Sequence, residues 1–143
     1  MQIKLKKLDE RAIIPTRGTS ASAGMDLYAL DAVTVGAGET VLVHTGIALA
    51  IPEGYAGFIY ARSGIATKRG LAPANKVGVI DADYRGEIMV ALHNHSAVSQ
   101  SVDAGERVAQ LVVAPFLPLE LVLADALDET ERAEGGFGST GKS

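Results

Sequence analysis

Short runs of Val, Ile, Leu and Thr recur along this sequence, and turn residues separate them at close intervals. The segments 36–38, 52–54 and 103–105, each of which contains glycine, are typical turns. Apolar residues keep a helical spacing over no long stretch, and only 63–69 predicts a short helix, with Ser63 as its cap. Regular short strands with such turns predict an all-β barrel or a jelly-roll-like sandwich. The predicted strands are a first strand near the N-terminus and the runs 25–29, 33–35, 40–44, 47–51, 55–60, 77–80, 87–94, 100–102, 107–114 and 119–123.

The composition limits the size and the partners of this fold. With 143 residues, of which 48% are hydrophobic, the chain fits one domain, which we expect over 1–130, followed by a flexible glycine-rich arm over 131–143. A formal charge of -4 argues against a binder of nucleic acid or of membrane surfaces, because the overall field repels phosphate polymers. An anionic substrate therefore needs a local basic cluster. The sequence has no cysteine, no signal-peptide pattern and no apolar stretch that could cross a bilayer, so we expect a reducing, cytoplasmic location.

The segment 78–86, GVIDADYRG, lies between an apolar run and an alternating run. It predicts a strand, a tight turn and a second strand, with Asp81 at the mouth of the first strand, Tyr84 beside it and Gly86 closing the bend. Taken alone, the pattern also fits a surface hairpin with solvated aspartates. In the functional interpretation, the turn supplies a catalytic carboxylate.

The segment 61–70 combines the parts of a phosphate-binding loop. A predicted strand ends at Ala61, and Arg62, Ser63 and Gly64 follow at the start of the short helix. A guanidinium group, a hydroxyl donor and backbone N–H groups left accessible by glycine suit phosphate binding. A capped surface turn with solvated basic residues is the alternative. The segment is a local basic cluster in an acidic chain, which an anionic substrate requires.

Three further features bear on a site or an interface. Gln110 falls on an apolar row of the strand 107–114, and a buried amide needs hydrogen-bond partners, whether it holds the fold or a ligand. In the tail, Phe137 stands alone among glycines and beside hydroxyl residues. Such a tail is disordered by default, or it closes over a ligand and stacks its ring on a base. Both faces of the strand 87–94 are largely apolar, which favours burial against another subunit.

Five short motifs occur in a fixed order from residue 23 to the end, and together they resemble the homotrimeric all-β family of deoxyuridine triphosphate nucleotidohydrolases (dUTPases). The resemblance implies a jelly-roll-like (β-clip) barrel with at most one short helix and a flexible C-terminal tail. Two departures are small: Ala61 stands where many relatives have proline, and residues 133–134 replace the pair common after the tail arginine. The second departure bears on how readily the tail closes, but it removes no functional group. The motifs are AGMDLYA at 23–29, RSGIATKRG at 62–70, GVIDADYRG at 78–86, GERVAQ at 105–110, and Arg132 with GGFGS at 135–139.

The resemblance implies hydrolysis of dUTP to dUMP and pyrophosphate, which limits uracil in DNA and supplies dUMP for dTTP synthesis. By similarity, Asp81 orients and deprotonates the water that attacks the α-phosphorus, a role that suits a carboxylate. Tyr84 packs its ring under the deoxyribose and excludes a 2'-hydroxyl by a clash. The hairpin 75–89 presents main-chain groups to the Watson–Crick edge of uracil. Its substrate-binding residues are Asn75, Val79, Ile80, Tyr84 and Met89.

The resemblance also assigns the groups that hold the triphosphate. Arg62, Ser63 and Gly64 bind it, and Gln110 helps to fix the phosphate or the water nearby. A Mg2+ cofactor bridges the phosphates. Phosphate oxygens and water hold this ion, with Asp26 as an outer-shell partner through water.

The tail completes the implied site. Phe137, with Gly138, covers the uracil, while Arg132, Ser139 and Thr140 reach the γ-phosphate. Arg132 belongs to the catalytic set together with Asp81 and Gln110. In relatives the three sites of a homotrimer lie between subunits, and the tail comes from a chain other than the one that supplies the hairpin.

Other functions fit parts of the sequence. A relative on the same fold that deaminates dCTP needs an added acidic residue, usually in a longer chain, and no matching insertion is present. A regulatory protein that keeps the nucleotide pocket but acts by docking a partner is the alternative from another class. His93 and His95 lie on one strand face as a metal pair would, but the sequence shows no third ligand. The apolar stretch 116–123 is too short for a membrane span and is broken by Pro118, so we expect a strand or arm that packs on a neighbouring chain.

Overall fold

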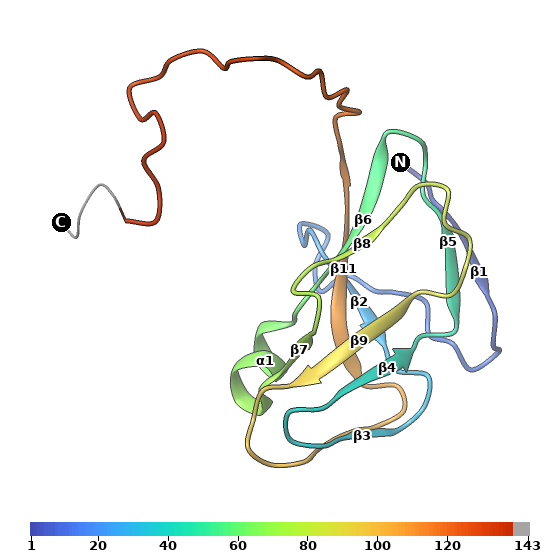
Figure 1. The fold of residues 1–143 in the computed structure, drawn as a ribbon. Coiled ribbons are helices and arrows are strands. Elements are labelled where there is room, and N and C mark those ends of the chain that lie inside the picture. The colour runs from blue at the N-terminus through green and yellow to red at the C-terminus, as the bar shows by residue number, and fades with distance from the viewer. Residues whose placement is uncertain (139–143) are drawn as a thin grey trace.

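The structure is a computed structural model, and it describes residues 1–138. Eleven strands and one short helix form in this part of the chain (Figure 1). The predicted all-β fold with a single short helix is therefore confirmed. The elements are β1 (Lys4–Lys7), β2 (Met25–Tyr28), β3 (Val33–Val35), β4 (Thr40–His44), β5 (Ile47–Ala50), β6 (Tyr55–Tyr60), α1 (Ser63–Arg69), β7 (Leu71–Pro73), β8 (Gly78–Ile80), β9 (Met89–Asn94), β10 (Gln100–Val102) and β11 (Arg107–Pro115).

The strands pair in antiparallel sheets whose order places the motifs. The largest sheet has the order β2-β11-β6-β8, and a second has the order β4-β9-β7. Two pairs complete the body, β1 with β5 and β3 with β10. Because β11 lies between β2 and β6, Gln110 stands opposite Asp26 on one side and opposite Tyr60 on the other. Residues of the first and fourth motifs thus lie side by side, next to the end of β6, which leads into the second motif.

The core forms between these sheets from alternating apolar side chains. Ile88, Val90 and Leu92 point inward and are at most 2% exposed, as the alternation of this segment predicts. The intervening residues of β9 are partly exposed, so the second apolar face of this strand is not fully covered within one chain. Burial of one such aliphatic side chain contributes roughly 1.5–3 kcal/mol to stability.

The predicted hairpin around Asp81 is wrong. The strands β8 and β9 flank this segment but do not pair with each other, because β8 pairs with β6 and β9 pairs with β4 and β7. A turn does form locally, since the N–H of Tyr84 donates to the C=O of Asp81 at 3.1 Å. The segment 81–88 therefore connects two sheets, and its far end is held by Ile88, whose N–H donates to the C=O of Ile47 at 2.8 Å.

The helix α1 has its predicted range but not its predicted cap. Arg62 occupies the N-cap position with extended backbone and no side-chain cap hydrogen bond, whereas Ser63 already lies inside the helix. The helix ends at Gly70, which takes the left-handed conformation with φ 67° that glycine adopts without strain. Leu71–Pro73 then forms β7, which the sequence analysis missed because this run is short and ends in proline.

After β11 the chain leaves the body as an extended arm (Figure 1). The predicted strand 119–123 does not form, since this segment has no strand to pair with inside the chain. Its apolar side chains face solvent, and Leu121 is 92% exposed. The predicted division into a domain over 1–130 and an arm over 131–143 stays a prediction. No helix within residues 1–138 is both long and apolar enough to span a membrane.

Candidate active site

The first candidate hollow is a cleft beside β8. Its volume is about 300 Å³, at the lower end of the roughly 300–1,000 Å³ typical of small-molecule sites. It brings together the residues of 75–89 that the sequence analysis expected to contact the base and sugar, but not Phe137 or Gly138 of the tail. The lining consists of Leu42, Ile59, Asn75, Gly78, Val79, Ile80, Asp81, Tyr84, Glu87, Ile88, Met89 and Ala91.

Asp81 and Tyr84 both line this cleft and are exposed. They are the first and last residues of one turn. The hydroxyl of Tyr84 donates to the C=O of Glu87 at 2.8 Å, which fixes the far end of the ring. Gly86 lies against the same ring, and a Cβ there would come within 2.5 Å of the hydroxyl oxygen. Glycine at position 86 therefore leaves the space that the Tyr84 ring occupies, in addition to closing the bend.

The loop before β8 carries a strained residue. Lys76 has φ 64°, in the left-handed region that side chains other than glycine rarely occupy. Next to it, the N–H of Val77 donates to the C=O of Asn75 at 2.7 Å, so the turn is tight. Strained backbone clusters at functional sites, and this turn sets the position of Asn75 at the cleft wall.

The second candidate hollow has a volume of about 440 Å³ and a charged lining. Asp26 on β2 accepts a hydrogen bond from Nε of Arg62 at 2.7 Å, and Nη1 of Arg107 lies 3.4 Å from its other oxygen. Two guanidinium groups meeting one carboxylate leave further N–H donors for an anion. The lining consists of Gly18, Ser22, Ala23, Gly24, Asp26, Arg62, Ser63, Gly64, Arg107 and Gln110.

Gln110 makes a structural hydrogen bond, and its role toward a ligand stays a prediction. Its Nε2 donates to the C=O of Ala61 at 2.8 Å, which ties β11 to the end of β6. The same side chain lines the second hollow. Gly24 lies against it so closely that a Cβ there would overlap the amide oxygen. A structural hydrogen bond therefore presents this side chain to the hollow.

The two hollows share no lining residue. The described part of the arm, residues 131–138, reaches neither of them within this chain: Nε of Arg132 donates to the C=O of Gly135 at 2.8 Å, and Phe137 is fully exposed. Ser139 and Thr140 lie outside the described residues. A single chain thus holds the expected groups as three separate parts.

The described residues offer no ready-made metal centre. Within residues 1–138, no three His, Cys, Asp or Glu side chains gather so that they could hold an ion. The rings of His93 and His95 meet edge to face, with centroids 4.4 Å apart, but Nδ1 of His93 lies 2.8 Å from Oγ1 of Thr40. The carboxylate of Asp26 is neutralised by its arginines.

Sequence reasoning missed two charged residues of these hollows, Arg107 and Glu87. Arg107 lies in the GERVAQ motif and could have been considered as a second arginine beside Arg62. Glu87 contacts the cleft from the end of the Asp81 segment. Its role depends on a partner forty-one residues away in sequence, so no local signal could have indicated it.

Comparison with known proteins identifies the family of this chain. A family model described as dUTPase matches residues 10–141. The deoxyuridine 5'-triphosphate nucleotidohydrolase of Nautilia profundicola is 46% identical over 142 residues, which cover 99% of this chain and 100% of that protein.

Solved structures show the same fold. A mutant of the Staphylococcus bacteriophage 80alpha dUTPase, solved with dUpNHpp, matches with a TM-score of 0.93 and 28% identity over 99% of both chains. A mutant dUTPase from phage phi11 of S. aureus, described as coordinating a structural Mg(II) ion, matches with a TM-score of 0.81 and 26% identity over 88% of this chain and 98% of that one. The predicted jelly-roll-like fold is thereby confirmed, and the chain belongs to the dUTPase family.

Proposed function

We propose that this protein hydrolyses dUTP to dUMP and pyrophosphate, and thereby limits uracil in DNA and supplies dUMP for dTTP synthesis. The observation that carries the proposal is the edge position of β8 beside Asp81 and Tyr84. In the part of the chain that the structure describes, β8 pairs with β6 alone. One edge of β8 therefore has backbone N–H and C=O groups available at the cleft that its residues line.

The edge of β8 suits uracil. Uracil presents one N–H donor between two carbonyl acceptors, so alternating backbone groups of residues 78–80 can bind it in the manner of an added strand. Cytosine has a donor and an acceptor reversed on this edge, which leaves buried groups unpaired and costs about 1–3 kcal/mol for each group. The 5-methyl group of thymine would meet the cleft wall, to which Met89 contributes.

Asp81 is the proposed general base. Its carboxylate accepts a proton from water while the water oxygen bonds to the α-phosphorus. The bond from the α-phosphorus to the oxygen that bridges it to the β-phosphorus breaks, and pyrophosphate leaves with that oxygen. Tyr84, in the same cleft, packs its ring under the deoxyribose, so that a 2'-hydroxyl is excluded by a clash.

The second hollow is the proposed phosphate site. Arg62, Ser63 and Gly64 begin α1 there, and Gln110 contributes an amide aimed at the phosphate or at the water. We infer that Mg2+ enters with the triphosphate and that Asp26 contacts it through water, since a lone carboxylate paired to arginines suits an outer-shell role. When bound, the ion neutralises charge on the phosphate oxygens.

We further propose that the working unit is a homotrimer with shared sites. Two observations support it. The two hollows have separate linings, and the segment 116–127, which follows β11, exposes a row of apolar side chains. In this arrangement Arg132, Phe137, Gly138, Ser139 and Thr140 of one chain close over a cleft formed by others.

The trimer has its own test. Sedimentation at several concentrations should give the mass of three chains for the wild type, and Leu121→Asp should shift it toward one. Val98→Asp, at an exposed residue of the loop after β9, is the matched control and should stay trimeric. A wild-type mass of one chain, with full activity, would contradict the shared site.

The activity test is pyrophosphate release with Mg2+ from dUTP, UTP, dCTP and dTTP. We expect release from dUTP alone and a loss of about 10²–10⁴-fold in Asp81→Asn, the usual contribution of a general base. Asp83→Asn is the control, because this neighbouring carboxylate is exposed and does not line the cleft. Full activity of Asp81→Asn would show that water is activated elsewhere. Ammonia release from dCTP would favour the deaminase, and nucleotide binding without turnover would favour the regulatory protein.

A further inference from the structure

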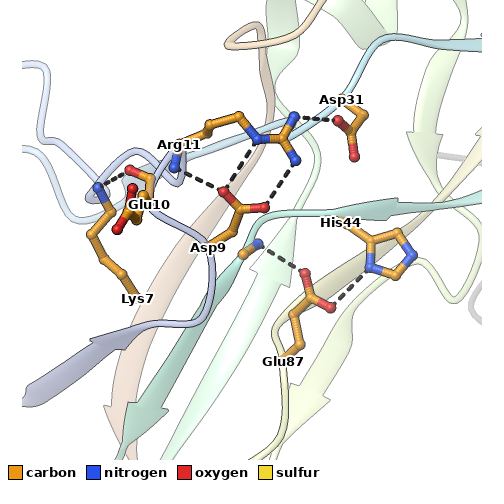
Figure 2. Close-up of polar contacts among 8 residues, drawn as sticks. Lys7, Asp9, Glu10, Arg11, Asp31, His44 and Glu87 are labelled. Atoms are coloured by element: carbon orange, nitrogen blue, oxygen red, sulfur yellow. Dashed lines mark hydrogen bonds and ion pairs between the residues drawn. The ribbon is translucent and has the colours of Figure 1, made fainter.

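Glu87 joins the tyrosine of the cleft to a distant turn. Its backbone C=O accepts the hydroxyl of Tyr84 at 2.8 Å. Its side chain reaches in another direction: Oε1 accepts the N–H of Gly46 at 2.8 Å, and Oε2 lies 2.9 Å from Nδ1 of His44 (Figure 2). The carboxylate side chain is 22% exposed, so its contacts are partly shielded from water. One residue thus links the proposed sugar platform to the turn between β4 and β5.

That turn is a rigid anchor. Gly46 has φ 69°, and a Cβ there would come within 2.9 Å of the Cβ of Ala12. Both the backbone conformation and the contact with Ala12 therefore exclude a side chain at position 46. The C=O of Gly46 accepts the N–H of Leu8 at 2.7 Å, and the C=O of His44 accepts the N–H of Leu30 at 2.8 Å. Backbone hydrogen bonds from Leu8 and Leu30 therefore hold both sides of the turn.

A second polar cluster lies next to the same turn. Arg11 contacts Asp9 at 2.9 Å and Asp31 at 2.7 Å, and Figure 2 shows this cluster beside the pair of His44 and Glu87. It joins the loop after β1 to the loop after β2. A Cβ at Gly46 would lie 3.4 Å from the Cβ of Asp9, so the cluster borders the turn that Glu87 contacts.

The segment that carries Tyr84 makes few side-chain hydrogen bonds to the rest of the molecule. Within the described chain, the side-chain hydrogen bonds of Tyr84 and Arg85 go to Glu87 or to C=O groups of the segment itself. The next residue, Ile88, is bound to the body through its backbone, at Ile47 and at the hydroxyl of Thr45. The C=O of Glu87 and the N–H of Ile88 belong to one planar peptide group, so the bond to Ile47 also holds this C=O. The Glu87 carboxylate holds the other side of the residue, its Cα, where the segment that carries Tyr84 begins. Loss of the carboxylate would therefore leave β9 in place and loosen mainly this segment.

We propose that Glu87 is a positioning residue for discrimination at the sugar. Its carboxylate holds the Cα of Glu87, where the segment that carries Tyr84 joins the body, and its backbone C=O accepts the hydroxyl of Tyr84. The inference rests on the proposed role of Tyr84 as the surface under the deoxyribose. A ring free to tilt excludes a 2'-hydroxyl less well, because rejection by a clash requires a wall that does not yield. Hydrolysis of dUTP itself continues, since Asp81 and the phosphate hollow make no side-chain contact with this carboxylate.

The test compares kcat/KM for dUTP with kcat/KM for UTP. Glu87→Ala should lower this ratio about tenfold, a change equivalent to ~1.4 kcal/mol, with less effect on kcat for dUTP. Glu87→Gln keeps an acceptor for the N–H of Gly46 and should recover most of the ratio. Tyr84→Phe removes the other end of the link, so the double variant Glu87→Ala/Tyr84→Phe should lose no more than the stronger single variant.

Glu39→Ala is the matched control. The Glu39 side chain also accepts a backbone N–H, that of Gly36 at 3.2 Å, in a turn that does not line the cleft. If Glu87 merely stabilised the fold, both alanine variants would lower the melting temperature and neither would change the ratio, and that result would overturn the inference.

Tyr84→Ala separates this inference from the one on which it rests. An unchanged ratio in Tyr84→Ala would remove the proposed sugar contact, and the role of Glu87 with it. A ratio that falls in Tyr84→Ala but is unchanged in Glu87→Ala would leave the sugar contact standing and refute the positioning role alone. Both readouts need only steady-state rates at a temperature well below unfolding.

Discussion

Asp26 and Arg62 form the shorter of the two ion pairs at the second hollow, with Nε of the arginine 2.7 Å from the carboxylate. The Asp26 side chain is only 15% exposed. β11 pairs with both β2 and β6 and so brings Asp26 on β2 close to Arg62, which follows the end of β6, although β2 and β6 do not pair with each other. The pair orients the guanidinium group before any ligand arrives.

Removal of this carboxylate should weaken nucleotide binding. In Asp26→Ala the guanidinium groups of Arg62 and Arg107 lose their partner, so we expect KM for dUTP to rise at least about tenfold, and the free energy of unfolding to fall by about 1–3 kcal/mol. Steady-state kinetics and urea denaturation measure the two effects. Asp31→Ala breaks an exposed pair with Arg11 and should change neither by much. Equal KM values for Asp26→Ala and the wild type would contradict the orienting role.

Gly24 should tolerate no side chain while Gln110 is present. A Cβ at residue 24 would lie 3.1 Å from Cδ of Gln110 and closer still to its amide oxygen, so Gly24→Ala should displace the amide from the C=O of Ala61. We expect a stability loss of about 1–3 kcal/mol, typical of overpacking, and a lower kcat.

The clash can be checked by a double variant. Gly24→Ala/Gln110→Ala should be more stable than the sum of its single changes, because the second substitution removes the group that the first one meets. Gly18→Ala is the control, since a Cβ there has an ordinary contact of 3.5 Å with Ser22. Additive losses would show that the two residues do not conflict.

Leu92 is a sensitive position of the core. Its side chain is fully buried on β9, so Leu92→Ala should lower the free energy of unfolding by about 2–5 kcal/mol through lost burial and the cavity that remains. Urea denaturation at one fixed protein concentration measures this. Val98→Ala, at an exposed residue of the following loop, should change it by less than about 0.5 kcal/mol. A loss no larger than that of the control would mean that the strand repacks.

Stability should fall as the pH drops below the ordinary pKa of histidine. Partial desolvation, together with the nearby charges of His93 and Lys76, lowers the pKa of His95 from its ordinary value of 6.5. The unfolded chain therefore binds this proton at a higher pH than the folded one, and the stability present above pH 6.5 is lost as the pH falls through the folded pKa. Melting temperatures at pH 7.5 and 5.5 should differ less in His95→Gln than in the wild type. An identical difference would show that this histidine does not contribute.

Most strands and the one helix could be predicted because their signals are local. Alternating apolar residues, such as Ile88, Val90 and Leu92, reveal a strand with a buried face whatever it pairs with. Gly70 marks the end of the helix through its own backbone preference. The motif residues Asp81, Tyr84, Arg62 and Gln110 could be named for the same reason, since each stands in a short pattern of fixed spacing.

Which strands pair with each other depended on the tertiary structure. The sequence suggested that the strands on either side of Asp81 pair with each other, but β8 pairs with β6 and becomes an edge strand. Sheet register joins residues far apart in the chain, and a local pattern carries no information on which distant strand supplies the hydrogen bonds.

The same division holds for the site. The sequence by itself determined which chemical groups the protein has: one carboxylate beside an aromatic ring, a basic loop and a glycine-rich tail. The tertiary structure decided how they are held, through contacts such as Arg107 with Asp26 and Glu87 with Gly46, which span 81 and 41 residues. Such contacts arise only when packing of the whole core has brought the strands into register, and this is why no local spacing indicates them.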